Sequence, residues 1–268
     1  MKERLDKLLV EKELFTSREK ARSYIIGGHI TVDGETVIKP SALIPRVANI
    51  RIHLPNEGYV SRGGLKLKGA LVDLQIDVSG AYCLDIGAST GGFTDCLLKK
   101  GAKYVIALDV GKNQIDYRLR KDPRVKVIEK FNARFIDTLE TTVPFGIVTI
   151  DVSFISVKKI LKPLIQLIDE TVQIIVLIKP QFELNRPYKG FRGVVKDRDI
   201  HKQILQDLNC FFFQAGYTIK GYTFSHIKGP KGNIEYFVCL GKKDREKESE
   251  KCIDNIESLV RKSWEYLH

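Results

Sequence analysis

The sequence of 268 residues lacks two features that membrane or secreted proteins carry. It contains no apolar run of eighteen residues, which is about the length a helix needs to cross a bilayer. The first residues, MKERLDKLLVEKEL, are charged and contain no continuous apolar stretch, so they are not typical of a secretory signal peptide. We therefore expect a cytoplasmic protein with no membrane partner.

Cysteine is also scarce. The chain has five cysteines, an odd number, with no C-x-x-C pair among Cys83, Cys96, Cys210, Cys239 and Cys252. This spacing fits neither a disulfide framework nor a zinc site, so we expect reduced and mostly buried thiols. His29, His53, His201 and His226 likewise show no metal-ligand spacing, so we expect no metal site. We expect these histidines at the surface or facing RNA.

Acidic residues are too few to balance the basic ones. The formal net charge is +11, from 44 Lys and Arg against 33 Asp and Glu. Residues 1–54 hold a surplus of three positive charges, residues 242–268 hold none, and residues 55–241 hold the remaining eight. A polyanionic partner is the natural inference, since Lys and Arg neutralise phosphates and release counterions. Charge alone does not separate RNA from DNA or from an anionic membrane surface.

Residues 1–54 have the pattern of a small α+β module. Leu5, Leu8 and Leu9 share one face of a first helix, and a capping box at Thr16-x-x-Glu19 predicts the start of a second. Strands expected at 29–32 and 36–39 flank Asp33-Gly34, a hairpin turn signal, and a last strand is expected at 49–53. The second helix exposes three basic side chains, Arg18, Lys20 and Arg22.

The segment SREKARSYIIGGHITVDG, residues 17–34, resembles the S4 RNA-binding domain in its helix, glycine turn and hairpin. The resemblance implies that the module binds RNA. The alternative reading is that the basic helix is a solvated face.

Residues 55–60 look like a linker, because Pro and Gly break both flanking patterns. A helix is expected at 62–74. From residue 81 onward, apolar strands alternate with amphipathic helices, which predicts a mostly parallel sheet covered on both faces, in an α/β domain from residue 61 to 268. The strands are expected at 82–86, 104–109, 125–129, 145–151, 174–179, 217–224 and 235–240. The last two of these strands should form an antiparallel hairpin at one edge of the sheet. A charged tail at 242–251 and a terminal helix at 252–267 complete the chain.

The segment LDIGASTGGFT, residues 84–94, lies between a strand and a helix. Its glycines allow a tight turn and close approach of a ligand to the helix N-terminus. Asp109 ends the next strand, where a carboxylate can bind a ribose diol. The spacing is not G-x-G-x-x-G, and Asp85 before the loop would repel a pyrophosphate but can reach an ammonium group. S-adenosylmethionine is therefore favoured over a dinucleotide.

The loop resembles the DLGAxPGGW motif of the FtsJ-type ribose methyltransferases, with Ser89-Thr90 in place of the usual pair. The resemblance implies a Rossmann-like class I methyltransferase fold. It also implies a cofactor site made of Asp85, Gly87, Ser89, Thr90, Gly91, Gly92, Phe93, Thr94, Asp109, Asn132 and Asp151.

Charged residues come at the carboxyl ends of two apolar strands. Asp151 ends IVTID and Lys179 ends IIVLIK, while Glu235 opens a later strand and Lys66 lies on the helix before the sheet. A Lys there is costly unless it has a partner or a purpose. Two lysines and two carboxylates suit methyl transfer to a hydroxyl, which must lose its proton. Burial and nearby positive charge would lower the pKa of Lys179 toward that of a base, although Asp151 opposes the shift. A set of structural salt bridges is the alternative.

The four residues match the Lys-Asp-Lys-Glu tetrad of ribose 2′-O-methyltransferases one by one. With YVSRGG, DVSFIS, KPQFE and GNIEYF, the chain resembles the TlyA (hemolysin A) group from about residue 2 to 241. The resemblance implies S-adenosylmethionine-dependent methylation of cytidine ribose in 16S or 23S ribosomal RNA, with Lys179 as general base. RNA contacts are expected from Arg18, Lys20, Arg22, Arg62, Lys189 and Arg192. We expect a monomer with ribosomal RNA or subunits as partner and no protein partner.

Two other functions remain open at this point. A membrane-active cytolysin would match the hemolysin name, but the sequence has no signal peptide, spanning segment or strongly amphipathic membrane helix. An RNA-binding protein with an inactive methyltransferase domain would match the S4 module, but the glycine loop and the tetrad are intact.

Overall fold

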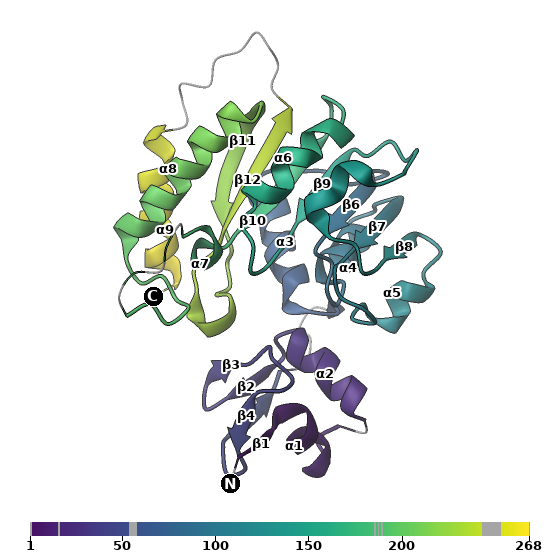
Figure 1. The fold of residues 1–268 in the computed structure, drawn as a ribbon, viewed down its shortest axis with the longest axis vertical. Coiled ribbons are helices and arrows are strands. Elements are labelled where there is room, and N and C mark those ends of the chain that lie inside the picture. The colour runs from purple at the N-terminus through teal and green to yellow at the C-terminus, as the bar shows by residue number, and fades with distance from the viewer. Residues whose placement is uncertain are drawn as a thin grey trace.

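The structure, a computed structural model, describes residues 2–15, 17–53, 58–184, 186, 188, 190–242 and 253–267. A small N-terminal module lies beneath a larger α/β domain (Figure 1). Among the described residues, no helix combines the length and the apolar character that a membrane span requires.

The N-terminal module packs two helices against short strands. Its elements are β1 (Lys2–Arg4), α1 (Leu5–Glu11), α2 (Arg18–Ile26), β2 (Ile30–Val32), β3 (Glu35–Thr36), β4 (Leu43–Pro45) and β5 (Ile50–Ile52). β2 pairs antiparallel with both β3 and β5. Leu5, Leu9 and Ile25 are fully buried in its core. The antiparallel pair β1–β4 was not expected from the sequence, because each strand has only three residues.

The start of α2 differs from the expected capping box. Thr16 lies outside the described residues, and the N-cap is Ser17, whose Oγ accepts a hydrogen bond from the Lys20 amide at 3.2 Å. The helix therefore begins one residue later than the pattern Thr16-x-x-Glu19 predicts. The predicted hairpin at Asp33-Gly34 is confirmed, since both residues adopt positive φ between β2 and β3.

The larger domain is built on a seven-stranded sheet in the order β11-β12-β10-β9-β6-β7-β8. Its strands are β6 (Tyr82–Ile86), β7 (Tyr104–Leu108), β8 (Val125–Ile128), β9 (Ile147–Ile150), β10 (Gln173–Ile178), β11 (Tyr217–Phe224) and β12 (Tyr236–Lys242). β12 runs antiparallel to both β10 and β11, so the expected hairpin at one edge is confirmed. The mostly parallel sheet is confirmed as well.

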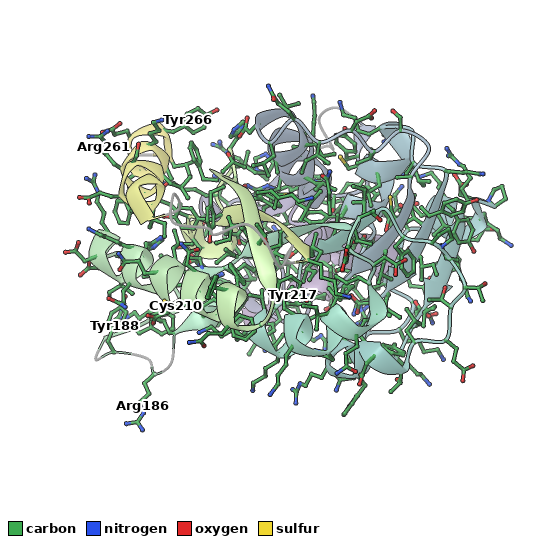
Figure 2. The ribbon with its side chains drawn as sticks, turned by 90° about the horizontal axis from the view of Figure 1, so that it is seen from above. Arg186, Tyr188, Cys210, Tyr217, Arg261 and Tyr266 are labelled. Atoms are coloured by element: carbon green, nitrogen blue, oxygen red, sulfur yellow. The ribbon has the colours of Figure 1, made fainter. Side chains whose placement is uncertain are left out.

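Helices cover both faces of this sheet. They are α3 (Arg62–Asp73), α4 (Gly92–Lys99), α5 (Tyr117–Lys121), η2 (Ala133–Thr138), α6 (Lys158–Leu167), α7 (Pro180–Glu183), α8 (Arg198–Gln214), η3 (Pro230–Gly232) and α9 (Ile253–Leu267). One core joins α3, α4 and α5 to one face, and the other joins η2, α6, α8 and α9 to the opposite face. α8 and α9 lie side by side (Figure 2). Because β10 is covered on both faces, QIIVLI is almost wholly apolar.

Two expectations about single side chains need correction. His29 and His201 were expected at the surface, but they are 3% and 0% exposed. His201 bonds to Tyr236 and to the Val195 carbonyl, which satisfies both ring nitrogens. Three of the four described cysteines are buried, as expected, and Cys210 is exposed on α8.

Candidate active site

A cavity of about 610 Å³ lies at the carboxyl ends of β6, β7, β9 and β10. The chain order of the sheet reverses between β6 and β9, and such a switch point opens a crevice beside the strand ends. Lining residues come from both parts of the molecule, because Gly28, Thr36 and Ile38 of the N-terminal module close one side. The volume is in the range of small-molecule and cofactor sites.

The glycine-rich loop between β6 and α4 forms one wall of the cavity. Gly87 and Gly91 have φ of +85° and +93°, and Gly91 is the N-cap of α4. A side chain at Gly87 would collide with the Asp151 carbonyl, and one at Gly91 with Leu119. Glycine is therefore required at both positions, and the chain bends closely around the space in front of α4. Ser89 has a φ of +49° within the same loop.

Eight of the eleven residues predicted for the cofactor site line this cavity: Gly87, Ser89, Thr90, Gly92, Phe93, Asp109, Asn132 and Asp151. Gly91, Thr94 and Asp85 are not among its lining residues.

Asp85 lies beneath the loop instead of facing a ligand. It is fully buried, and its two carboxylate oxygens accept hydrogen bonds from Thr94 on α4 at 2.7 Å and Thr149 on β9 at 2.8 Å. Burial raises the pKa of Asp85 to about 6, although both threonine hydroxyls oppose the shift. Asp85 therefore joins α4 to β9 under the loop, and its expected contact with an ammonium group stays a prediction.

Asp109 and Asn132 mark the opposite end of the cavity. The Asp109 carboxylate accepts hydrogen bonds from the amides of Ser89 at 2.8 Å and Gly111 at 2.6 Å. A carboxylate has about four acceptor positions, so Asp109 can still accept from a ribose diol. Asn132 caps η2 through its side-chain oxygen, which accepts from the Arg134 amide at 3.1 Å.

The four tetrad residues form two adjoining ion pairs. Lys66 Nζ on α3 lies 2.5 Å from Glu235 Oε2, and Lys179 Nζ after β10 lies 2.5 Å from Asp151 Oδ1. Glu235 is fully buried, whereas Lys66, Asp151 and Lys179 line the cavity. Glu235 Oε1 accepts no hydrogen bond within the described part of the chain, and Gly229 packs directly against it. The structure thus brings the predicted tetrad together at one edge of the sheet.

The protonation of Lys179 differs from the sequence expectation. Burial lowers the pKa of its ammonium group, but the carboxylates of Asp151 and Glu235 raise it by more, so the pKa lies above its ordinary value. Lys179 also donates a hydrogen bond to Ser153 Oγ at 2.9 Å. Without further positive charge nearby, the amine is therefore protonated at neutral pH.

Phe154 is a cavity residue that sequence reasoning missed. It lies three residues after Asp151 in DVSF, has a φ of +64° and is 86% exposed at the cavity. Its ring contacts Phe182 at a centroid distance of 5.0 Å. A bulky residue in the left-handed region is uncommon and marks functional sites, but the sequence gives no direct sign of backbone strain.

The residues predicted to contact RNA fall into different environments. Lys20, Arg22 and Arg192 are exposed, and Lys189 lies outside the described residues. Arg18 is half-exposed and donates to the buried carboxylate of Asp6 at 2.8 Å. Arg62 has both terminal nitrogens engaged within the protein. In the basic segment before α8, Arg186 projects away from the body of the molecule (Figure 2).

Comparison with known proteins gives a consistent result along the chain. Residues 59–242 match the model of the FtsJ-like methyltransferase family, and residues 3–45 match the S4 domain. The chain is 43% identical over 237 residues to Hemolysin A of Brachyspira hyodysenteriae, covering 88% of this chain and 98% of that protein. It is 38% identical over 238 residues to the 16S/23S rRNA (cytidine-2′-O)-methyltransferase TlyA of Mycobacterium tuberculosis, covering 88% of this chain and 89% of that protein.

A solved structure from Streptococcus thermophilus that carries a hemolysin name has a TM-score of 0.76 and 37% identity, covering 99% of this chain and 96% of that one. The two family matches span both parts of the molecule, and the range 59–242 contains the glycine loop and the four tetrad positions. The chain therefore belongs to the FtsJ-like methyltransferase family, in the S4-containing group of TlyA and hemolysin A proteins.

Proposed function

We propose that this protein transfers a methyl group from S-adenosylmethionine to the 2′-hydroxyl of a cytidine ribose in ribosomal RNA. The observation that carries the proposal is the pair of lysine–carboxylate contacts at the inner end of the cavity, Lys66–Glu235 and Lys179–Asp151. The relative from M. tuberculosis is named for this reaction on 16S and 23S rRNA. We extend that choice of RNA to this chain as part of the proposal.

The residues present fit S-adenosylmethionine. The loop at Gly87 and Gly91 has no room for side chains, so backbone can approach the ligand closely, and Asp109 retains acceptor capacity for the ribose. The methionine end would lie toward Asp151, with Asp85 supporting the loop from below. When bound, this cofactor supplies an electrophilic methyl group on a positively charged sulfur.

Lys179 would take the proton of the acceptor hydroxyl. Its carboxylate neighbours keep the amine protonated in the free protein, so an additional positive charge must counteract them. The positively charged sulfur of the bound cofactor is a charge that the free protein lacks and that can do so. Asp151 holds the Lys179 amine in place at 2.5 Å and stabilises its protonated form once the proton has moved. Lys179 is thus a base only in the assembled complex.

The N-terminal module, residues 1–54, would place the RNA, with 55–60 as linker and 61–268 as catalytic domain. Lys20 and Arg22 are exposed on α2 and free to approach phosphates. The acceptor nucleotide has to leave its stack to bring a ribose hydroxyl to Lys179, as in enzymes that act on a flipped nucleotide. Phe154 offers an exposed ring at the cavity for an unstacked base.

Two measurements test this proposal together. Addition of S-adenosylmethionine should raise the melting temperature of the protein, because a ligand that binds only the folded state stabilises it. Incubation of ribosomal subunits with methyl-labelled cofactor should then label RNA. A melting temperature that does not move, or label that stays out of every ribosomal RNA while the protein binds the cofactor, would refute the proposal.

A further inference from the structure

The guanidinium of Arg62 bridges the two parts of the molecule. Its Nη1 donates to Thr36 Oγ1 on β3 of the N-terminal module at 3.1 Å. Its Nη2 donates to the Lys228 carbonyl at 2.9 Å, in the loop that leads to Glu235. A planar guanidinium fixes both partners at defined angles, which a lysine cannot do.

Backbone contacts meet at the same place. The Arg62 amide donates to the Gly27 carbonyl at 3.3 Å, and His29 Nε2 lies 3.3 Å from the Val60 carbonyl. α3 begins at Arg62, and Lys66 lies one turn further along the same face of that helix. Contacts with the N-terminal module therefore fix the first turns of α3, the helix that carries the tetrad residue Lys66.

The module also forms part of the active-site wall. Gly28, Thr36 and Ile38 line the same cavity as Asp151 and Lys179. α2 and β3 are the elements of the module that face the catalytic domain (Figure 1). If the module moved away, the cavity would lose this wall and Arg62 would lose its bond to Thr36.

We propose that Arg62 is a positioning residue that docks the N-terminal module as a wall of the active site, and that it is not a phosphate ligand. This replaces the role in RNA contact that the sequence predicted for it. The inference uses the proposed methylation for one of its measurements, while a second measurement is independent of activity.

The test compares Arg62→Lys, Arg62→Gln, Thr36→Val and the double variant of Arg62→Lys with Thr36→Val against a matched control, Thr31→Val. Thr31 lies on the neighbouring strand β2, and its hydroxyl contacts His53 within the module at 2.9 Å, so it has no part in the bridge. Arg62→Lys keeps the positive charge but loses the guanidinium that contacts Thr36 and Lys228 at the same time. Thr36→Val removes only the hydroxyl acceptor. Each variant is measured for single-turnover methylation at saturating RNA and cofactor, and for hydrogen exchange of the peptide at 58–66.

If Arg62 docks the module, Arg62→Lys and Thr36→Val should each lower the single-turnover rate by roughly tenfold or more, because small misplacements of reacting groups slow the reaction strongly. The double variant should be no worse than Arg62→Lys, because both changes break one interaction. The Arg62 amide should exchange faster in both, and Thr31→Val should match wild type. The slope of RNA affinity against salt should stay constant, because no charge is removed.

The inference is overturned if Thr36→Val equals Thr31→Val in rate and in exchange. It is also overturned if Arg62→Lys is fully active while Arg62→Gln makes the salt dependence shallower, as removal of a phosphate ligand would. If wild-type protein methylates no RNA, the proposed function fails, and the exchange measurement still decides whether Arg62 and Thr36 hold the module.

Discussion

Two buried aspartates, one in each part of the molecule, have opposite electrostatic surroundings. Asp6 in the N-terminal module and Asp85 in the catalytic domain are both fully buried. Hydrogen bonds from Arg4 and, next, from Arg18 outweigh burial and lower the pKa of Asp6 to about 2. Burial is the dominant influence on Asp85, whose partners are two neutral threonines, and it raises the pKa to about 6.

The difference matches the two tasks that the proposed function assigns to the two parts of the protein. Asp6 holds the half-exposed guanidiniums of Arg4 and Arg18 in fixed positions at the surface. In the proposed function this positive charge would contact RNA phosphates. The catalytic domain instead keeps its ion pairs at the buried edge of an apolar sheet, where electrostatic interactions are stronger than in water. Under this proposal, RNA binding depends on the exposed charges of the N-terminal module, and methyl transfer depends on the buried ion pairs of the tetrad.

The largest effect is expected from changes to the buried ion pairs of the tetrad. Lys179→Arg keeps the positive charge but cannot accept a proton, because a guanidinium stays protonated throughout the working range. Methyl transfer should fall by roughly 10²–10⁴, the usual contribution of a general base. Single-turnover kinetics checks this, with Lys162→Arg on the exposed face of α6 as the control for the substitution itself.

The pH profile of the same reaction sharpens the test. Because the neighbouring carboxylates raise the pKa of Lys179 in the free protein, the wild-type rate should increase with pH from neutral pH, in proportion to the neutral amine. The positive charge of the bound cofactor should shift the plateau of this profile to lower pH. A variant with near-normal rates and the same profile as wild type would show that Lys179 only positions the substrate.

An intermediate effect is expected from removing each buried aspartate. Asp6→Asn should cost about 1–2 kcal/mol at pH 7, because the ion pairs reach half-exposed guanidiniums and solvent weakens them. The folded-state pKa of Asp6 lies below its unfolded value of 3.8, so this stability is present above pH 4 and is lost as pH falls toward 2. Urea unfolding at pH 7 and pH 3 measures the change.

Asp85→Asn should show the opposite dependence on pH. The folded-state pKa near 6 lies above the unfolded value of 3.8, so the wild-type contribution is present below pH 4 and is lost as pH rises through 6. The stability of Asp85→Asn relative to wild type should therefore improve between pH 4 and pH 7. If both variants had the same dependence on pH, the contrast between the two sites would be wrong.

The smallest effect is expected at the exposed charges. The double change Lys20→Gln and Arg22→Gln should reduce the salt slope of RNA affinity by about 0.7–0.9 for each phosphate that the variant no longer neutralises. Arg261→Gln on α9 removes one exposed charge from a different face of the molecule and should leave the slope unchanged (Figure 2). Equal slopes for the α2 variant and wild type would remove α2 from the RNA-binding surface.

Much of the fold could be predicted because the pattern of apolar residues in the sequence agrees with which residues the fold buries. The strands at 82–86 and 217–224 were predicted with their observed limits, and the others differ by one to three residues at their ends. β10 is almost wholly apolar because helices cover both faces of the sheet, a pattern that composition reveals directly. The pair β1–β4 escaped prediction because three-residue strands are stabilised by pairing between distant segments.

The tetrad could be predicted because carboxyl ends of parallel strands meet at one edge, which brings Asp151 and Lys179 together. What could not be predicted are consequences of tertiary packing. The burial of Asp85 depends on Thr149, sixty-four residues away, and the engagement of Arg62 depends on Thr36 and Lys228. No spacing in the sequence reveals such interactions, and the same holds for the net rise in the pKa of Lys179.

The position of the transferred methyl group tests the central claim most directly. Ribosomal RNA treated with the protein and labelled S-adenosylmethionine should be hydrolysed in alkali and the products separated. A 2′-O-methyl group removes the nucleophile for cleavage at that nucleotide, so we predict that the label is recovered in an alkali-resistant dinucleotide with cytidine on its 5′ side. Label recovered in mononucleotides would place the methyl group on a base and would contradict the account of the tetrad.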